Sequence, residues 1–294
     1  MNRMGAISAT LKSINYSHKY TPPLLITGIL LAAHLSFGVL ESYPKLIAAI
    51  AASFVTELVL HRLIVGGWRN LSSAYISGIS VGILIRSPQL WPFAICSVIS
   101  IASKYALRYK GRHIWNPSNF GVVMMLLLAP RSVAVLSIQW GNNMWAMLII
   151  WIVGSVSIYR LRRFHICAAY VLSFLAFALL RSWISGDPYL AEVAPITGPM
   201  YQLFIFFMIT DPKTTVKRRW AQIVVIILVA FVEMVLRINE AVYAPFYALF
   251  IVGPLAMIAE LWWDDRQPGS LTGRATEQDV PRYETDDRQS GSPA

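Results

Sequence analysis

The stretch AQIVVIILVAFVEMVL, residues 221–236, is apolar except for Gln222 and Glu233. A similar run, LLITGILLAAHLSFGVL, occupies residues 24–40. Of the 294 residues, 56% are hydrophobic and only 14% are charged, whereas ordinary soluble domains carry roughly 25% charged residues. Long apolar runs indicate helices that cross a membrane, because a helix satisfies its own backbone polar groups in lipid. The sequence therefore predicts an all-α polytopic membrane protein.

About ten apolar segments follow one another and predict a membrane domain over residues 22–263. We interpret the first run as a retained span rather than a cleaved leader. The third, fifth and eighth segments are shorter than the roughly 20 residues that a span requires, which is typical of half-helices or broken helices. The segments are 23–40, 45–63, 72–86, 89–107, 116–129, 143–158, 164–182, 196–210, 219–237 and 242–262.

The Lys and Arg residues follow the predicted loops. With the N-terminus in the cytoplasm, 20 of the 25 fall on the inner side, and each of the five outer loops holds one. This asymmetry follows the positive-inside rule, so we expect both termini in the cytoplasm. It also accounts for the net charge of +10 without a nucleic-acid partner. Residues 1–21 form a cytoplasmic segment, and the polar residues 264–294 a disordered cytoplasmic tail, either simply solvated or used for docking.

Two short segments resemble each other. ISGISVGILIRSP (76–88) and ITGPMYQLFIFFMITDP (196–212) both open with Ile, Ser or Thr, and Gly, and both close on a polar pair and Pro. Each is the third segment of a five-segment half, about 22–130 and about 143–263, and an odd number of spans inverts the second half. Inverted repeats with interrupted short helices place a site where the halves meet. The alternative is ordinary helix punctuation by Gly and Pro.

Two motifs on the predicted inner side are candidates for a binding site. In GRHIWNPSNFG (111–121), Pro117 favours extended geometry at Asn116, and Ser118 or Asn119 can cap the next helix and so form an anion site. The cations Lys110, Arg112 and His113 lie nearby in sequence. The alternative is a capped turn with topology-setting charges.

The second motif is MITDPKTTVKRR (208–219), in which Asp211 follows Thr210. Asp211 either caps the next turn or positions a bound ligand, and Gly198 opens the apolar run that leads to it. The charge pattern places both motifs on the same membrane face.

Ionisable groups inside spans are costly and tend to face the bundle interior or an ion path. Glu57 and His61 lie four residues apart on one predicted helix face, and Glu233 lies toward the outer end of its span. We regard these three as a candidate ion path, with a structural role as the alternative, and His34 as hydrogen-bonded. Cys96 and Cys167 fall in apolar runs without metal-ligand spacing, so no metal site is expected.

Together these motifs resemble the RnfD/NqrB family of membrane electron-transport subunits. The resemblance rests on HIWNPSNFGVVMMLLLAP (113–130), FFMITDPKTT (206–215) and AVYAPFYALFIVGPLAMIAE (241–260), with YISGISVGILIRSP (75–88) at the place of the family's early short span. It covers roughly residues 20–262. It implies ten spans in two inverted five-helix repeats, a bacterial inner (cytoplasmic) membrane location, a flavin, ion coupling and partner subunits. The flavin-site residues it suggests are Arg112, His113, Asn116, Pro117, Asn119, Gly198, Thr210 and Asp211.

The chain departs from the family at one place. Family members carry Ser/Thr-Gly-Ala-Thr between the two motifs, and its last Thr binds FMN covalently. No such tetrapeptide stands between Asn116 and Asp211, as in a shorter branch called UnbU that accompanies enediyne-type biosynthetic genes. Covalent FMN is therefore not expected, and FMN or riboflavin would bind non-covalently. The alternatives are a non-redox transporter or channel, or a biosynthetic accessory protein on the same fold.

Overall fold

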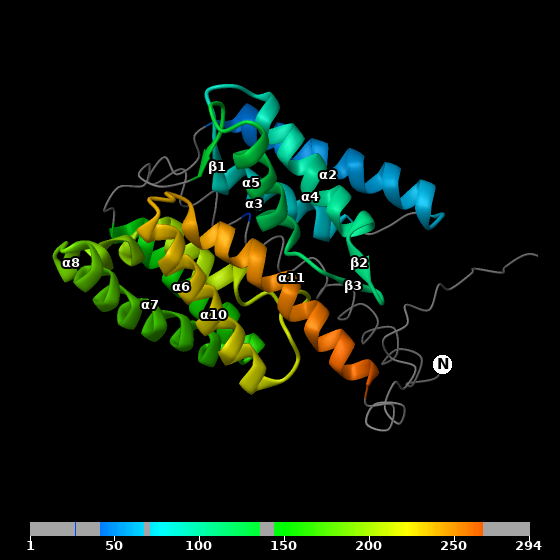
Figure 1. Cartoon of the computed structure of the whole chain (residues 1–294). Helices are drawn as coiled ribbons and strands as arrows, with labels where there is room; N and C mark the ends of the chain where they lie inside the picture. The colour runs from blue at the N-terminus through cyan, green and yellow to red at the C-terminus, as the bar shows by residue number, and fades with distance from the viewer. Residues whose placement is uncertain (1–26, 28–41, 68–70, 136–143, 267–294) are drawn as a thin grey trace, which may run out of the picture. The chain divides into compact units, whose positions relative to one another are not determined.

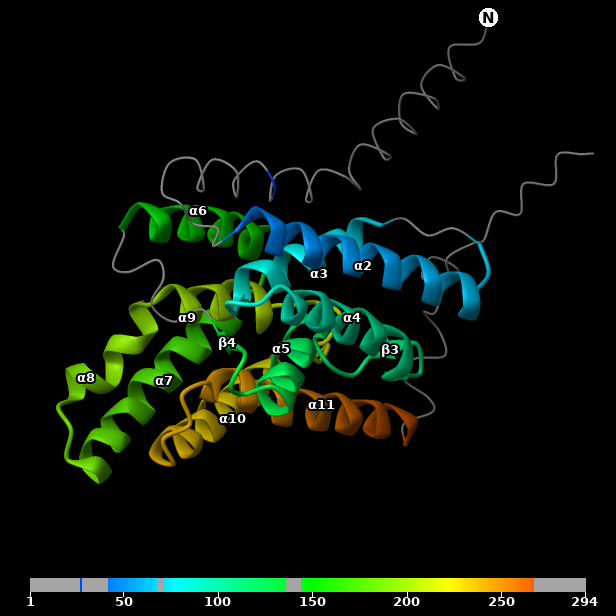
Figure 2. The same ribbon diagram turned by 90° about the horizontal axis from the view of Figure 1, so that it is seen from above.

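A computed structural model of the chain describes residue 27 and residues 42–67, 71–135 and 144–266 (Figures 1 and 2). Residues up to Met257 form one compact unit, and the second unit begins at Ile258, within the last helix. The described elements are α2 (Tyr43–Ile64), α3 (Ser72–Leu84), β1 (Ile85–Arg86), α4 (Trp91–Ala106), β2 (Arg108–Tyr109), β3 (Arg112–His113), α5 (Pro117–Leu128), β4 (Ala134–Val135), α6 (Met144–Leu161), α7 (Phe164–Ser185), α8 (Tyr189–Val193), η1 (Ala194–Thr197), α9 (Pro199–Leu203), the π-helix η2 (Phe204–Met208), α10 (Arg219–Ile238) and α11 (Ala244–Asp265).

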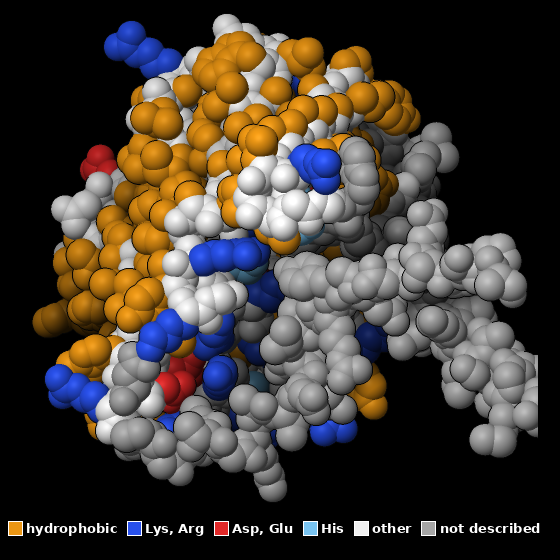
Figure 3. Space-filling model, turned by 90° about the vertical axis from the view of Figure 1, so that its right-hand side faces the viewer, with side chains coloured by type: hydrophobic (Ala, Val, Ile, Leu, Met, Phe, Trp, Pro, Cys, Tyr) orange, Lys and Arg blue, Asp and Glu red, His pale blue; other side chains and the backbone are white. Residues whose placement is uncertain are grey.

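The described residues are mostly helical, as expected, and several helices suit a membrane. Helices α2, α7, α10 and α11 are each long and apolar enough to cross one, and the bent pair Tyr189–Thr197 and Pro199–Met208 adds a fifth candidate within the described ranges. On α7, Leu172 and Trp183 are 67% and 83% exposed, which suits contact with lipid rather than water. Figure 3 shows a broad hydrophobic surface above a group of Lys and Arg side chains. These features support a membrane-embedded protein.

The predicted short segments are short in the structure. Helices α3 and α5 are 13 and 12 residues long, and the eighth segment is broken, with a 59° bend after Thr197. Gly198 takes an extended conformation at this bend, and Pro199 begins the next helix. The short helices α8 and η1 before it were not predicted. The first predicted segment, residues 23–40, and the two terminal segments lie outside the described residues, apart from Thr27 and residues 264–266.

Close helix contacts through glycine build the first half of the chain. Helix α2 packs on α3 and α4, and α5 packs on α4. A Cβ on Gly78 would lie 2.8 Å from Ile50 Cα, and one on Gly82 would lie 2.5 Å from Leu46 Cδ1. These two glycines, four residues apart on α3, let the backbones of α2 and α3 approach closely, as small residues do in membrane helix pairs.

Two short antiparallel pairs connect helices of this half. Strands β1 and β4 pair Ile85 with Val135, which joins the segments that follow α3 and α5. Strands β2 and β3 form a hairpin through Lys110 and Gly111, both with positive φ (50° and 78°). Two positive φ angles in a two-residue loop are the geometry of a type I′ turn. The hairpin leads directly to the start of α5.

In the second half, α7 packs along α10, and α6 contacts the broken segment α9–η2. Gly154 on α6 makes this contact possible, because a Cβ there would lie 2.4 Å from the Phe206 ring. The π-helix η2 covers FIFFM just before Thr210 and Asp211. Single π-helical turns are rare and occur frequently at functional sites.

The start of α5 is attached to α11. Pro254 lies inside α11 and has no N–H, so the carbonyl of Phe250, four residues earlier, loses its usual helical partner. Trp115 Nε1 donates to this carbonyl at 2.9 Å, and Asn119 Nδ2 donates to the Phe246 carbonyl at 3.2 Å. Two hydrogen bonds thus fix the Asn-Pro turn to the last helix.

Candidate functional site

A cavity of about 650 Å³ lies between α3, the start of α5, α6 and η2. Its volume falls in the range of small-molecule sites, which are typically roughly 300–1,000 Å³. The two segments whose sequences resemble each other, 76–88 and 196–212, both contribute to its wall. Most of that wall is apolar, and its apolar residues include Ile76, Ile79, Ile83, Ile149, Val153, Leu203 and Phe206.

Most polar residues that line the cavity lie at helix ends, while Ser77 and Ser80 within α3 and Ser157 within α6 also line it. Ser72 and Ser73 start α3, Pro117 and Ser118 start α5, and Lys104 lies in the last turn of α4. Residues 210–213, which follow η2, complete this group. The charge pattern predicts all these helix ends on the cytoplasmic side. The cavity therefore has an apolar body and a polar, partly charged end.

The two sequence motifs meet at this polar end. Asn116 Nδ2 donates a hydrogen bond of 3.1 Å to Asp211 Oδ2. The same oxygen accepts from the Thr214 hydroxyl at 3.1 Å, and Asp211 Oδ1 accepts from the Lys213 backbone N–H at 3.1 Å. The Asp211 carboxylate thus accepts hydrogen bonds from three protein donors. The bond from Asn116 holds the two motifs together.

The cap of α5 differs from the prediction. Asn116, not Ser118 or Asn119, is the N-cap, and its Oδ1 accepts the Asn119 N–H at 3.1 Å. Pro117 occupies the first helical turn because its fixed φ and missing N–H suit that position. Asn116 is extended, as predicted, with φ −63° and ψ 120°. Asn116, Pro117 and Ser118 all line the cavity.

The other predicted site residues divide into those at the cavity and those away from it. His113 and Thr210 line it, and the buried Thr210 hydroxyl donates to the Phe206 carbonyl at 2.6 Å. Arg112 is not among the lining residues, and its guanidinium donates to the Thr215 carbonyl at 3.0 Å. Neither Asn119 nor Gly198 is among the lining residues; Asn119 faces α11, and Gly198 forms the bend of the broken segment.

Arg163, between α6 and α7, adds a charge near the second motif. Burial lowers the pKa of its guanidinium, and the Asp211 carboxylate partly offsets this effect by raising it. Asp211 therefore interacts with Asn116 from the first half of the chain and with Arg163 from the second.

Sequence reasoning missed the most buried charge of the cavity, Lys104. It was counted with the loop cations, but its residue is only 4% exposed and lines the cavity. Its Nζ lies 3.9 Å from Glu57 Oε2 and 3.3 Å from both the carbonyl and the hydroxyl of Ser73. The signal in the sequence was its position inside a helical apolar segment, SVISIASKYA, rather than after it.

Glu57 lies behind this lysine, on α2. It is fully buried and accepts a 2.8 Å hydrogen bond from the Tyr105 hydroxyl. His61 is one helical turn away on the same helix, and its buried Nδ1 has no hydrogen-bond partner among the described residues. These two members of the predicted ion path therefore occupy neighbouring turns of α2.

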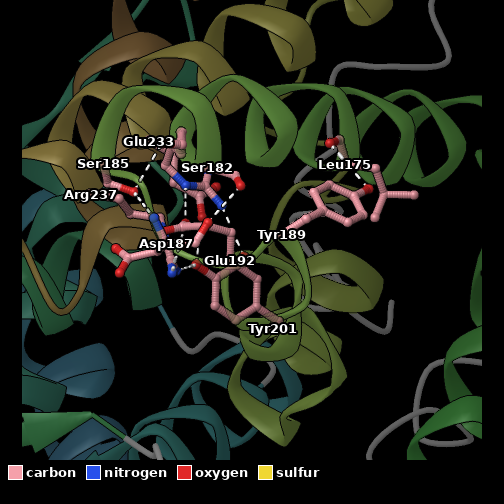
Figure 4. Close-up of polar contacts among 10 residues, drawn as sticks. Leu175, Ser182, Ser185, Asp187, Tyr189, Glu192, Tyr201, Glu233 and Arg237 are labelled. Carbon is pink, nitrogen blue, oxygen red and sulfur yellow. Dashed lines mark hydrogen bonds and ion pairs between the residues drawn. The ribbon is translucent and has the colours of Figure 1, made fainter.

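Glu233, the third predicted member, belongs to a separate cluster in the second half (Figure 4). Its carboxylate accepts hydrogen bonds from the hydroxyls of Tyr170 on α7 and Tyr201 on α9. Arg237 donates to Tyr201 at 2.9 Å, and the buried Arg181 binds Glu192 on α8. Glu233 is fully buried, so its network joins α7, α9 and α10 rather than facing outward.

Within the described ranges, no group of three or more His, Cys, Asp or Glu side chains is arranged to hold a metal ion. Cys96 and Cys167 are both buried free thiols, as the sequence predicts for small apolar-site residues.

The comparisons with known proteins add no family assignment. No protein-family model matches the chain, and no curated protein is similar enough to count as a relative.

Proposed function

We propose that this protein is an integral membrane subunit of an RnfD/NqrB-like electron-transport system, and that its cavity binds a flavin non-covalently. One observation carries the proposal. Two of the motifs on which the sequence resemblance rests, far apart in the chain, meet through Asn116 and Asp211 at the polar end of one cavity.

The cavity fits a flavin in volume and in chemistry. Its apolar body, with Ile79, Val153 and Phe206 among its walls, suits a flat aromatic ring system. Its polar end offers Ser118 and Lys213 to the polar side chain of the flavin. The missing attachment tetrapeptide fits a bound but not covalently linked group.

A bound flavin would supply the electron-carrying chemistry, while the protein supplies position and electrostatics. Asn116 and Asp211 fix the polar end of the cavity, because their hydrogen bond joins the start of α5 to the segment after η2. Phe206 and the apolar residues of α3 and α6 exclude water from the body of the cavity. We expect electrons to enter and leave through partner subunits in a bacterial cytoplasmic membrane.

The proposed ten-span inverted repeat has support from matching contacts. The second and fourth segments of each half pack together, as α2 with α4 and α7 with α10. Each of these pairs is joined by a Glu–Tyr hydrogen bond, Glu57 with Tyr105 and Glu233 with Tyr170, with the Glu on the second segment in the first half and on the fourth segment in the second half. The third segments of both halves line the cavity, which is where inverted repeats place substrate sites.

The flavin content of the purified protein tests this function. We expect the detergent-solubilised protein, expressed with its genomic neighbours, to show flavin absorbance that denaturation releases into the small-molecule fraction. Val153→Trp fills the cavity and should abolish this absorbance. Val156→Trp is the matched control, because Val156 is an exposed residue on the same helix and does not line the cavity. A flavin-free wild-type protein refutes the proposal, and flavin that stays on the peptide refutes the non-covalent part.

A non-redox transporter on the same fold is the second candidate. The observation that favours it is the cavity beside a broken helix, in a chain that lacks the covalent attachment motif. For this function we expect Glu57→Gln to abolish ion-coupled flux in liposomes, since Glu57 is a buried carboxylate directly behind the cavity wall. Flux that is unchanged by this substitution removes Glu57 from the mechanism.

A further inference from the structure

We propose that Lys104 is the counter-ion for a phosphate group on the ligand of this cavity, which therefore prefers phosphate-bearing amphipathic molecules over their neutral analogues. The inference rests on the proposed function in that it takes the cavity to be the ligand site. It goes further by naming the chemistry that the polar end recognises. For a flavin, it selects FMN over riboflavin.

The first support is the placement of Lys104. Lysine is almost never fully buried unless it is paired, because its charge is costly to remove from water. Lys104 is only 4% exposed, yet it lines a largely apolar cavity from the last turn of α4. Its partners in the wall are Ser73 at 3.3 Å and Glu57 at 3.9 Å. These contacts hold the ammonium at the cavity wall.

The second support is the composition of the polar end. A second cation, Lys213, reaches it from the other half of the chain, and Ser72, Ser73 and Ser118 add hydroxyl groups. Asp211 is the acidic residue among the lining residues, and its oxygens already accept three protein donors. This end thus combines two cations with several hydroxyl groups, which are the groups that bind phosphate oxygens well.

The third support is the distribution of polar and apolar residues along the cavity. The apolar lining from α3, α6 and η2 lies beyond the polar end, so one molecule with an anionic head and an apolar body fills both parts. Glu57 lies on the far side of Lys104 and accepts the Tyr105 hydroxyl. A bound phosphate and Glu57 thus share the same ammonium, and removing the Glu57 charge should strengthen phosphate binding.

The test uses two ligand pairs that differ only in a phosphate group: FMN with riboflavin, and decyl phosphate with decanol. Binding to the wild-type protein in neutral-lipid nanodiscs is measured by the change in tryptophan fluorescence. We expect the phosphate member of a pair to bind about tenfold or more tightly, the usual range for a charge-assisted hydrogen bond. We expect Lys104→Met to abolish this preference without weakening the neutral member.

The controls separate recognition from folding. Lys104→Met removes the cation beside Glu57 and can destabilise the fold, so Lys104→Met/Glu57→Gln, which removes both charges, is tested as well. Glu57→Gln alone should keep or increase the phosphate preference. Lys110→Met, at the exposed hairpin tip, is the matched control and should change nothing.

Each outcome distinguishes this inference from the proposed function. A phosphate preference seen with the decyl pair alone, and lost with Lys104, supports the inference and refutes flavin binding. Equal binding of both members of each pair overturns the inference, as does a preference that survives in both Lys104 variants. Failure of all four ligands to bind overturns the inference and the flavin site together.

Discussion

Exchanging Asn116 and Asp211 tests the contact that joins the two motifs. In Asp211→Asn the side chain has one acceptor oxygen and one NH₂ group. Whichever way it turns, the NH₂ faces a donor, either Asn116 Nδ2 or the Lys213 backbone N–H. In Asn116→Asp alone, two carboxylates face each other. In the double exchange the carboxylate at 116 accepts from the amide at 211, so the contact is restored in reverse.

The structure gives the size of the effect. A hydrogen bond to a charged group contributes roughly 1.5–3 kcal/mol, and both side chains are only partly buried, so the lower end applies. We expect each single substitution to lower the free energy of unfolding by about 1.5 kcal/mol and the double exchange to recover about 1 kcal/mol. The capping of α5 is not lost, because Asp and Asn are equally good N-cap residues.

The assay is equilibrium unfolding with SDS in mixed micelles, followed by far-UV circular dichroism. Thr214→Val is the control, since it removes another bond to Asp211 Oδ2 without touching Asn116. None of its cost should be recovered when it is combined with Asn116→Asp, because an acceptor at 116 cannot replace the lost Thr214 donor. If the costs of the two exchanged substitutions are simply additive, the Asn116–Asp211 hydrogen bond does not stabilise the fold.

Three further sets of substitutions test the surrounding packing by the same measurement. Trp115→Phe should cost about 1–2 kcal/mol, but less in a Pro254→Ala background, where a restored N–H takes the carbonyl that Trp115 now binds; equal costs would contradict this. Gly121→Ala should destabilise strongly, because its Cβ would lie 2.8 Å from the Cys96 carbonyl, whereas Gly253→Ala meets only a side-chain atom at 3.7 Å and should be nearly neutral. Glu233→Gln should cost less than Glu233→Leu, because only the amide still bonds the tyrosine hydroxyls; the reverse order would remove the network from the stability argument.

The helical segments were predictable because long apolar runs end at charges, Gly or Pro. The run predicted over 219–237 is α10 at Arg219–Ile238, and the segment predicted over 164–182 is α7 at Phe164–Ser185. Gly198 was predicted to open the eighth segment, and α9 begins directly after it, at Pro199; the bend that joins α9 to the short helices before it was not predicted. Hydrophobicity along the chain was enough for the predicted segments.

Features that depend on contacts between segments were not predictable in the same way. The sequence allowed Ser118 or Asn119 as the cap of α5, and only the local geometry shows that Pro117 moves the cap to Asn116. The depth of Lys104 was missed because a basic residue near a helix end was counted as a loop charge. Which face of α4 turns toward α2 and the cavity is decided by packing, and a single sequence does not contain that information.

The role of Asp211 changes once its partners are known. From the sequence, Asp211 was expected either to cap the next turn or to position a ligand, and its carboxylate is used by Asn116, Thr214 and the Lys213 backbone. A carboxylate that already accepts three protein hydrogen bonds is a poor site for a ligand phosphate. Its bonds instead hold the polar end of the cavity together. Recognition of an anionic ligand then falls to Lys104, which sequence reasoning did not consider. The motif residues build the site, and a buried cation outside the motifs selects what enters it.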